Sequence, residues 1–377
     1  MKTNIRYSEL SAAVGAVKKA VPGRTTLGTL KNIRFDFEAN LLTLTTTDCD
    51  IFAVAEVHCS SIETPAISFL VDMKLLEQVL KTLKPKKSIS PTYLDIEIDD
   101  SISSMSVNSF SLAIDSNMEN FPEVTDVEPN VRLYPLPEQW DNIVDALNYV
   151  SNDMTRPALC GLNFSRSAVV GTNGCILKKI ACDHSYLEDK NFTVPTKALR
   201  CAAKLSAVNI GFAFGEKVIS HAFICGDVTN DVSVVYITRC ITEMYPNVDR
   251  VIPTESHPAL CIRDKTRLAK VVHQALVAAP DKDSRAHDRI EFNLSSNGSG
   301  QYLAASNSES GLKFNQTIDA SWSGDDMQVG VNGRYLLTCM QTLPDDYIAM
   351  EIDTPERALL FRDGVNTLLL MPVRAGN

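Results

Sequence analysis

Apolar residues recur at helical spacing in three segments of the chain, residues 71–81, 194–204 and 331–341. Each segment opens on a short apolar run that is typical of the end of a β-strand. A short polar residue suited to capping a helix comes next, and the apolar positions then repeat as in an amphipathic helix. The pattern predicts a strand that leads directly into a helix at three places.

The apolar faces of the three predicted helices fall in the same register. We expect the buried positions to be Leu76, Val79, Leu80 and Leu83 in the first helix, Leu199, Ala202 and Ala203 in the second, and Leu336, Cys339 and Met340 in the third. The same register gives each helix a basic residue at one position, namely Lys74, Lys197 and Arg334. Seven residues later, on nearly the same face, stand Lys81, Lys204 and Gln341. One face of each helix should therefore pack on a core, while the other is largely basic.

A second amphipathic helix is predicted before each of these segments, at residues 8–21, 137–150 and 263–276. Alternating or β-branched runs predict strands at residues 42–45, 51–57, 93–98, 110–114, 232–237 and 347–352. A chain of 377 residues is too long for one core, because single cores stop growing near about 250–300 residues. We predict an α+β protein of three domains, 1–126, 127–253 and 254–377, with boundaries near Asp126 and Pro253. Each domain should contain two helices packed on antiparallel sheets.

Composition and charge limit the classes of function. Hydrophobic residues make up 45% of the chain and charged residues 22%, which is ordinary for a globular protein. The net charge of −10 argues against a protein that coats nucleic acid with its whole surface. It still permits a local basic track, because phosphate contact depends on where Lys and Arg cluster.

The ten cysteines are scattered singly, with no Cys-X-X-Cys pair. Isolated thiols of this kind are typical of a reducing compartment rather than of a disulfide framework. No apolar run approaches the roughly 18–20 residues needed to cross a bilayer, and the N-terminal residues lack a signal-peptide core. We therefore expect a cytoplasmic protein.

Several local strings, at residues 21–24, 155–162, 171–177, 244–253, 332–335 and 370–374, are similar to motifs of one family. Together with the three-fold layout they resemble the bacterial DNA sliding clamp, the beta subunit of DNA polymerase III, over nearly the full length. The last three strings are specific only in combination. The chain departs from the family where Cys175 and Ile176 replace a His-Arg pair, and where it continues past Arg374 with a tail that could partly cover a neighbouring cleft.

The resemblance implies a fold and a function. Three clamp-type domains would form half of a closed ring, and two chains would close head to tail as a homodimer around double-stranded DNA, independently of its sequence. Such a ring is a processivity factor in DNA replication that tethers DNA polymerase, the clamp loader and other proteins with a clamp-binding motif. The family carries no cofactor and catalyses no reaction, so we expect neither catalytic residues nor a metal site.

In the family, the helices line the hole and face DNA. By resemblance and repeat position, the DNA-facing residues would be Lys18, Lys19, Arg24, Lys74, Lys81, Lys197, Arg200, Lys204, Lys265, Arg267, Lys270 and Arg334. Any single helical lysine could instead belong to an ordinary solvated face. The helix predicted at residues 137–150 carries Glu138, Asp141 and Asp145 and no basic residue, so it would repel phosphates.

The resemblance also implies a peptide-binding pocket between domains two and three, built as an apolar cleft with a few fixed polar groups. It would use Leu159, Thr172, Gly174, Cys175, Leu177, Pro246, Arg250, Val251, Asn332, Tyr335, Leu369, Met371, Pro372 and Val373. The flexible thioether of Met371 suits a surface that accepts several related peptides. Residues 368–371 are also typical of a buried last strand, and both interpretations can hold because successive residues of a strand point in opposite directions.

Two alternatives remain open. An enzyme would have to start from Cys175, with one of the six histidines to activate it, but the chain has no nucleophile string, phosphate loop or His-Glu-X-X-His motif. A clamp-like scaffold that binds peptides without encircling DNA is compatible with the acidic balance and the acidic helix.

Overall fold

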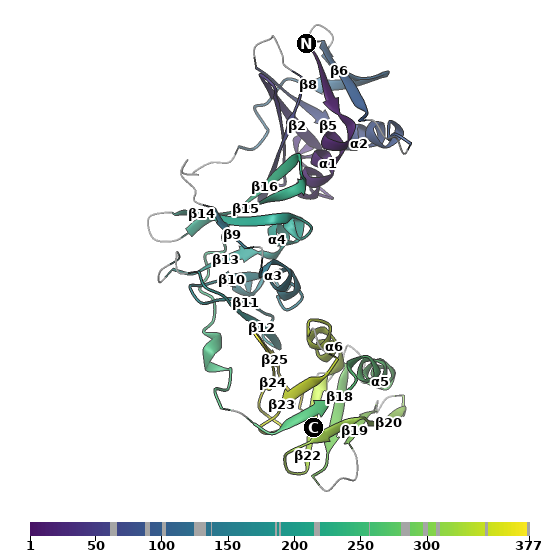
Figure 1. The fold of residues 1–377 in the computed structure, drawn as a ribbon, viewed down its shortest axis with the longest axis vertical. Helices are drawn as coiled ribbons and strands as arrows, with labels where there is room; N and C mark the ends of the chain where they lie inside the picture. The colour runs from purple at the N-terminus through teal and green to yellow at the C-terminus, as the bar shows by residue number, and fades with distance from the viewer. Residues whose placement is uncertain are drawn as a thin grey trace. The chain divides into compact units, whose positions relative to one another are not determined.

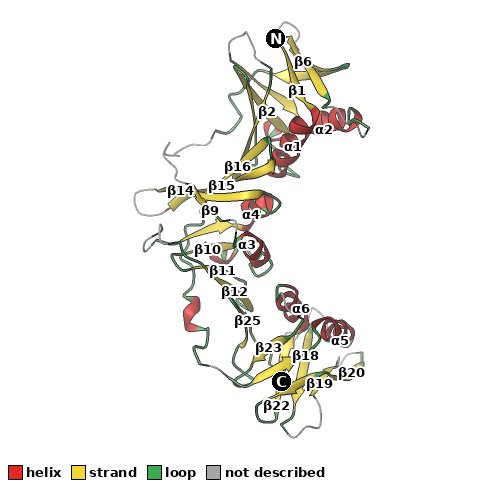
Figure 2. Cartoon of the chain, in the orientation of Figure 1, coloured by secondary structure: helices red, strands yellow, loops and turns green. Residues whose placement is uncertain are grey.

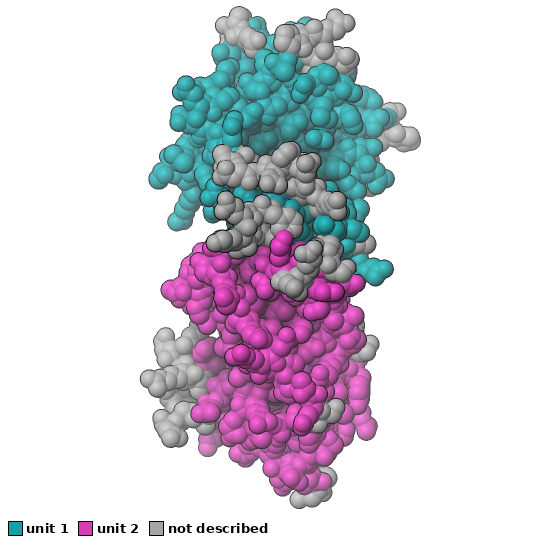
Figure 3. Space-filling view, turned by 90° about the vertical axis from the view of Figure 1, so that its left-hand side faces the viewer, with its two compact units in different colours: residues 1–140, 194–240 teal, residues 141–193, 241–377 magenta. Residues whose placement is uncertain are grey.

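The computed structural model describes residues 1–377 except 61–65, 87–90, 100–102, 124–132, 137, 185–186, 188–189, 215–218, 256, 280–286, 297–300, 307–309, 344–345 and 375–377. The chain forms two compact units, which Figure 3 colours separately. Unit 1 contains residues 1–140 and 194–240, and unit 2 contains residues 141–193 and 241–377. Each unit is described by itself.

Unit 1 is built on a twelve-stranded sheet of order β1-β6-β7-β8-β5-β2-β3-β4-β16-β15-β14-β9 (Figure 1). The strands are β1 (Lys2–Arg6), β2 (Asn32–Glu38), β3 (Leu41–Thr47), β4 (Ile51–His58), β5 (Ile67–Asp72), β6 (Tyr93–Asp99), β7 (Ser104–Val107), β8 (Phe110–Asp115), β9 (Leu133–Pro135), β14 (Ser206–Phe214), β15 (Ile219–Thr229) and β16 (Val232–Arg239). Its helices are α1 (Tyr7–Val17), α2 (Met73–Thr82) and α4 (Thr196–Ala202), with short 3-10 turns η1 (Lys18–Ala20) and η2 (Gly28–Lys31).

The core of unit 1 is built largely from strands in which buried and more exposed residues alternate, such as β2, β4 and β6. Phe35, Phe37 and Phe69 lie on one face of β2 and β5, and the rings of Phe35 and Phe69 stack with centroids 5.5 Å apart. Helix α1 buries Leu10 in the same unit, and the hydroxyl of the fully buried Tyr236 donates a hydrogen bond of 3.0 Å to the carbonyl of Ala16. The sheet is thereby fixed to α1.

Unit 2 contains a nine-stranded sheet of order β13-β10-β11-β12-β25-β24-β23-β17-β21 and a four-stranded sheet of order β20-β19-β18-β22. The strands are β10 (Gly161–Phe164), β11 (Ala168–Thr172), β12 (Ile176–Ala181), β13 (Phe192–Pro195), β17 (Ala259–Ile262), β18 (Arg289–Leu294), β19 (Gln301–Ser306), β20 (Lys313–Ile318), β21 (Ala320–Trp322), β22 (Met327–Asn332), β23 (Ile348–Glu351), β24 (Leu359–Asp363) and β25 (Asn366–Leu370). The helices are α3 (Trp140–Ala146), α5 (Lys265–Val277) and α6 (Gly333–Gln341), with 3-10 turns η3 (Pro157–Leu159) and η5 (Val248–Arg250). Helices α5 and α6 lie side by side over one apolar core (Figure 2).

The three predicted strand-to-helix segments are confirmed as β5–α2, β13–α4 and β22–α6. Lys74, Lys197 and Arg334 are each the second residue of their helix, so the shared register is correct. The prediction of a polar cap is correct for α2 and α6, where Asp72 and Asn332 accept hydrogen bonds from backbone amides. It is wrong for α4, which Pro195 precedes and whose N-terminus has no side-chain cap.

The helices predicted before these segments are present but differ in extent. Helix α1 ends at Val17, where the chain tightens into a 3-10 turn. Helix α3 ends at Ala146, and the following amides, including that of Tyr149, bond three residues back instead of four. Pro137, where the second of these helices was predicted to begin, lies outside the described residues. Leu83 and Ala203, predicted to be buried, are only half-buried, because each follows the last residue of its helix.

The middle third of the chain contributes strands to both large sheets. Strand β16 pairs with β4 in unit 1, with Val235 opposite Val54, while β12 pairs with β25 in unit 2, with Leu177 opposite Leu369. The division into two units follows these hydrogen-bonded ladders. The boundary predicted near Asp126 lies outside the described residues, and the division into three domains stays a prediction.

Candidate functional site

The basic residues at the shared helix position differ in their partners. Lys74 is exposed at the start of α2. Lys197 forms an ion pair with Asp48, and Arg334 donates from Nε to the buried Asp288 carboxylate at 2.8 Å. The side chains of Lys197 and Arg334 are nevertheless 53% and 63% exposed, so their positive charge still reaches solvent.

Lys18 and Lys81 converge on one carboxylate in unit 1. Their Nζ atoms lie 2.6 Å and 2.8 Å from the two oxygens of Glu77. The hydrogen bonds from these ammonium groups lower the pKa of Glu77 below its usual value, so Glu77 stays ionised at neutral pH. Glu77 therefore cancels part of the positive field of this basic face.

Two of the predicted DNA-facing lysines donate hydrogen bonds to backbone carbonyls of the protein. The ammonium of Lys19 donates to the carbonyl of Cys201 at 2.7 Å, and burial lowers its pKa. The ammonium of Lys265 donates to the carbonyl of Leu343, after the end of α6. The remaining basic residues of the set are exposed, and they are Arg24, Arg200, Lys204, Arg267 and Lys270.

Helix α3 is acidic, as the sequence indicates. Asp141 is exposed, and the side chain of Asp145 is 48% exposed. Strand β12 places Lys178 with a fully buried side chain, whose Nζ lies 3.4 Å from Asn142 Oδ1 and 3.9 Å from Asp145 Oδ2. A positive charge therefore lies beside α3 in the interior of unit 2.

The predicted peptide cleft includes the turn between β11 and β12. Thr172 Oγ1 accepts from the Gly174 amide, and Asn173 Oδ1 accepts from the amides of Cys175 and Ile176. Gly174 has φ of +91°, a conformation that strains any residue with a Cβ. Gly174 and Cys175 are left exposed at the tip.

The turn between β3 and β4 in unit 1 has the same hydrogen bonds. Thr47 Oγ1 accepts from the Cys49 amide, and Asp48 Oδ1 accepts from the amides of Asp50 and Ile51. Cys49, at the position of Gly174, has φ of +78°. The same device therefore closes corresponding hairpins in the two units.

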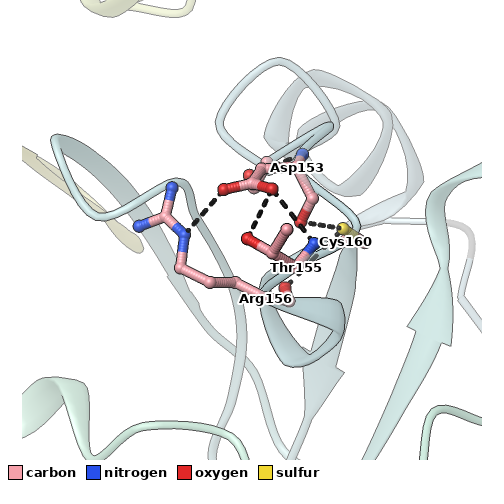
Figure 4. A network of polar contacts seen from close by, with 5 residues as sticks. Asp153, Thr155, Arg156 and Cys160 are labelled. Carbon is pink, nitrogen blue, oxygen red and sulfur yellow. Dashed lines mark hydrogen bonds and ion pairs between the residues drawn. The ribbon is translucent and has the colours of Figure 1, made fainter.

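Arg156, which was not among the predicted cleft residues, lies against the tip of the β11–β12 turn. A Cβ on Gly174 would be 3.3 Å from its Nη1. Figure 4 shows how Arg156 is held: its Nε donates to Asp153 at 3.3 Å, and the same carboxylate accepts from the amide and hydroxyl of Thr155. The Cys160 thiol donates to the backbone carbonyl of Asp153. The hydrogen bonds from Thr155, and then the one from Arg156, lower the pKa of the Asp153 carboxyl. Arg156 lies in the family-like string at residues 155–162, but the sequence does not show where its side chain points.

The floor of the predicted cleft is apolar and closed. Leu177 and Leu369 face each other across β12 and β25 and are 2% exposed. They belong to a small core against which Tyr245, Val248 and Met371 pack. Leu159, Thr172 and Asn332 are buried as well, and the Asn332 side chain caps α6, so these residues support the cleft.

The accessible wall of the cleft comes from α6 and the C-terminal segment. Tyr335 is half-buried, and its pKa is raised chiefly by burial and then by the neighbouring Cys175. Met371, Pro372 and Val373 are also half-buried, while Pro246, Arg250 and Val251 are exposed. The tail after Arg374 lies outside the described residues.

Arg289 and Gly330 position the end of the C-terminal segment. The Val373 amide donates to the Gly330 carbonyl at 2.8 Å, and Pro372 bridges to Val331. Arg289 Nε donates to the Val373 carbonyl at 3.1 Å, and its Nη2 lies 2.6 Å from Glu291. Arg289 passes so close over Gly330 that a Cβ there would meet its Nε at 2.4 Å.

None of the helices that the structure describes has the length and apolar composition needed to cross a membrane.

Comparison with known proteins gives matches at three levels. Residues 1–124 match the family model described as DNA polymerase III beta subunit, N-terminal domain. The beta sliding clamps of Synechocystis sp. and Bacillus subtilis are 24% and 22% identical to the chain, with at least 99% of this chain and all of each relative covered. The crystal structures of the Pseudomonas aeruginosa beta subunit and the Bacillus subtilis sliding clamp match the full length with TM-scores of 0.83 and 0.82, at 18% and 19% identity. These matches show that the chain is similar to bacterial beta sliding clamps over its full length and has the fold of the DNA polymerase III beta subunit.

Proposed function

We infer that the protein is a DNA sliding clamp, a processivity factor that encircles double-stranded DNA and tethers its polymerase. The observation that carries this inference is the similarity to beta sliding clamps over the whole chain, in sequence and in fold. The repeated basic residue at the second position of α2, α4 and α6 supports it. We propose no chemical step for the protein and no cofactor.

The proposed assembly is a homodimeric ring to which each chain contributes three domains. A ring holds DNA by topology, so its inner surface needs only a modest positive field and no contacts that read bases. Exposed side chains such as Lys74, Lys197 and Arg334 can supply that field. Lys19 and Lys265, whose ammonium groups donate to backbone carbonyls, contribute less directly.

Replacing Glu77 by Gln is expected to strengthen binding to linear duplex DNA by several-fold. Loss of this carboxylate frees Lys18 and Lys81 for phosphates, and the slope of log affinity against log salt should steepen by up to about 1. Fluorescence anisotropy over a series of salt concentrations measures both quantities. Because the pKa of Glu77 is lowered from 4.5, the DNA affinity of wild type should approach that of the variant only at pH values below 4.5.

Glu97→Gln is the matched control for this prediction. It removes a carboxylate of unit 1 that pairs with Lys2 at 3.0 Å, across strands β1 and β6 at the edge of the sheet. The control should leave DNA affinity unchanged. Equal affinities of Glu77→Gln and wild type would show that Lys18 and Lys81 do not face DNA.

We propose that partner proteins dock short peptides in the cleft formed by the β11–β12 turn, Tyr335 and residues 371–373. Its closed apolar floor and half-buried wall fit the usual composition of a recognition site. A Pseudomonas aeruginosa clamp that matches this chain along its full length is described as bound to griselimycin. That compound is therefore a suitable probe, and we expect it to bind in this cleft and to compete with partner peptides.

The clamp function is tested by primer extension on primed circular DNA with a polymerase and clamp loader from the same source. The protein should lengthen the products made in a single binding event. No stimulation, with griselimycin binding retained, would favour a peptide-binding scaffold instead. The mass in solution tests the ring, because a monomer at micromolar concentration would contradict a stable homodimer.

The proposed location is the cytoplasm, where a clamp meets its DNA. The structure supports a reducing environment, since Cys49, Cys160, Cys175 and the seven other cysteines are all free thiols.

A further inference from the structure

A pocket of about 230 Å³ lies in unit 1, where the β3–β4 turn meets the end of β16. Its lining includes Asp50 and Phe52 from the turn and β4, Ile237 and Arg239 from β16, and the exposed thiol of Cys49 at the tip of the turn. All of its lining residues belong to unit 1, so the pocket is separate from the peptide cleft proposed in unit 2.

The β3–β4 turn and β4 repeat the geometry of the β11–β12 turn and β12. The two turns have the same hydrogen bonds, which makes Asp50 the counterpart of Cys175. The carbonyl oxygen of Asp50 accepts from the Thr238 hydroxyl at 3.3 Å, and that of Cys175 accepts from the Met371 amide at 2.8 Å. Each turn is thus bonded to the chain segment that lies beside it.

The strands behind the two turns also pair in the same register. Phe52 of β4 lies opposite Ile237 of β16, as Leu177 of β12 lies opposite Leu369 of β25. Phe52 and Ile237 are half-buried, whereas Leu177 and Leu369 are each 2% exposed. The pocket in unit 1 therefore has an apolar floor that is more open to a ligand than the floor of the cleft in unit 2.

A short proline-containing segment is a further part of the repeat. Residues 121–123 are Phe-Pro-Glu, and residues 245–247 are Tyr-Pro-Asn. Phe121 is 4% exposed, and Pro122 next to it lines the pocket in unit 1. Tyr245 packs on the small core that contains Leu177. The pocket therefore has the same parts as the cleft in unit 2: a turn, an apolar strand pair and a proline segment.

The pocket differs from the cleft in its charges. Asp50, Glu123 and Arg239 line it, and two carboxylates against one guanidinium leave one net negative charge. Arg34 does not cancel Glu123, because its Nη1 is 3.9 Å from that carboxylate while its Nε is 2.8 Å from Asp36. The cleft in unit 2 has uncharged residues at the three corresponding positions, namely Cys175, Asn247 and Met371.

We propose that the pocket in unit 1 docks a short basic peptide of a partner protein. An apolar side chain of the peptide packs on Phe52 and Ile237, and a lysine or arginine beside it faces Asp50. The inference rests on the proposed function, because peptide docking in unit 2 is the activity that the repeat shares. It gives each chain a second docking site with a different charge preference.

Affinity labelling of the full-length protein tests the proposal, because each turn carries an exposed cysteine, Cys49 in unit 1 and Cys175 in unit 2. The reagent is bromoacetyl-Lys-Leu-Leu-Lys amide, whose CH₂ carbon bonds to the thiolate sulfur as bromide leaves. Mass spectrometry of proteolytic fragments gives the labelling rate at each cysteine, divided by the rate with bromoacetamide to remove differences in thiol reactivity. At Cys49 this relative rate should exceed that of the matching Glu-Leu-Leu-Glu reagent by about fivefold or more.

Two substitutions test the lining of the pocket. Asp50→Lys, at an exposed position, should lower the relative rate at Cys49 by about fivefold, and Phe52→Ala should lower it by removing half of the apolar floor. Glu56→Lys is the matched control, because it makes the same charge change at an exposed position of β4 outside the pocket. It should leave the rate unchanged. Equal rates with both reagents, or equal effects of Asp50→Lys and Glu56→Lys, would overturn the proposal.

Griselimycin distinguishes a failure of this inference from a failure of the proposed function. It should block labelling of Cys175 in unit 2 and leave labelling of Cys49 unchanged. Protection of Cys175 together with unselective labelling of Cys49 would contradict the pocket in unit 1 alone. Selective labelling of Cys49 without protection of Cys175 would support that pocket and contradict the cleft in unit 2.

Discussion

A Gly330→Ala variant is expected to lose most of its affinity for griselimycin. The new Cβ would lie 2.4 Å from Arg289 Nε and 2.6 Å from the Val373 carbonyl oxygen. One of these groups is backbone, so the C-terminal segment or Arg289 has to move, and Met371 and Val373 move with that segment. We expect binding to weaken by about tenfold or more, and overpacking to lower the free energy of unfolding by about 1–3 kcal/mol.

Gly15→Ala is the control for the Gly330 prediction. Gly15 lies in α1, and a Cβ there would meet nothing within 4 Å. That variant should gain about 0.5–1 kcal/mol in the free energy of unfolding and bind griselimycin normally. Arg289→Gln, which releases the Val373 carbonyl without a steric clash, should weaken binding to a smaller extent. Normal binding by a folded Gly330→Ala protein would show that residues 371–373 do not form the cleft wall.

Lys178→Met is expected to stabilise the protein. The Lys178 side chain is fully buried, and its contacts with Asn142 and Asp145 are too long to compensate for the loss of hydration. Because Asp145 is 48% exposed, its carboxylate remains hydrated when the ammonium is removed. We expect the free energy of unfolding at neutral pH to rise by about 1–3 kcal/mol, as when poorly compensated buried charges are replaced by apolar groups.

The pH dependence of this gain follows from the pKa of Lys178. Burial lowers that pKa from 10.5 in the folded state, while Asp145 and Asp363 act in the opposite direction. The unfolded chain then binds the proton more tightly, so the charged lysine destabilises wild type below its folded pKa. This cost disappears as the pH rises toward 10.5, and the advantage of the variant shrinks with it.

Chemical denaturation at pH 7 and at alkaline pH measures the effect. Lys179→Met is the control on the same strand, because Lys179 is partly exposed and pairs with Asp249 at 2.6 Å. This substitution should change the free energy of unfolding by no more than about 1 kcal/mol at either pH. A Lys178→Met protein less stable than wild type at pH 7 would show that the buried ammonium is stabilised by its carboxylates.

The periodicity of the sequence predicts the repeated elements well, because each strand-to-helix segment has one buried face. It does not predict the partners of Lys197 and Arg334, since Asp48 and Asp288 are brought to them only by tertiary structure. Lys178 could not be found either. Residues 176–178 of β12 are all buried, so the strand has no alternation that distinguishes Lys178 from Lys179.

The residues of the candidate cleft were predicted without their exposure. The structure shows which of them are buried and which are accessible. Leu177 and Leu369 form a closed floor, whereas Tyr335 and Met371 are open to a ligand. Arg156 was missed because its place beside Gly174 depends on a hydrogen bond to Asp153. The basic residues were also predicted only in part. Their positions recur periodically in the sequence, but the partial neutralisation of Lys18 and Lys81 by Glu77 does not follow from that period.

Two hairpins of the chain have the same turn, at Thr47–Ile51 and at Thr172–Ile176. In each turn some residues set the register of the strands, and others are free to vary. In both, a threonine hydroxyl and an Asp or Asn oxygen bind successive amides, so these two side chains fix where the second strand starts. The left-handed residue between them is cysteine in one hairpin and glycine in the other. The tip can therefore change chemically, as Cys175 illustrates in the cleft, while the pairing of the strands behind it is preserved.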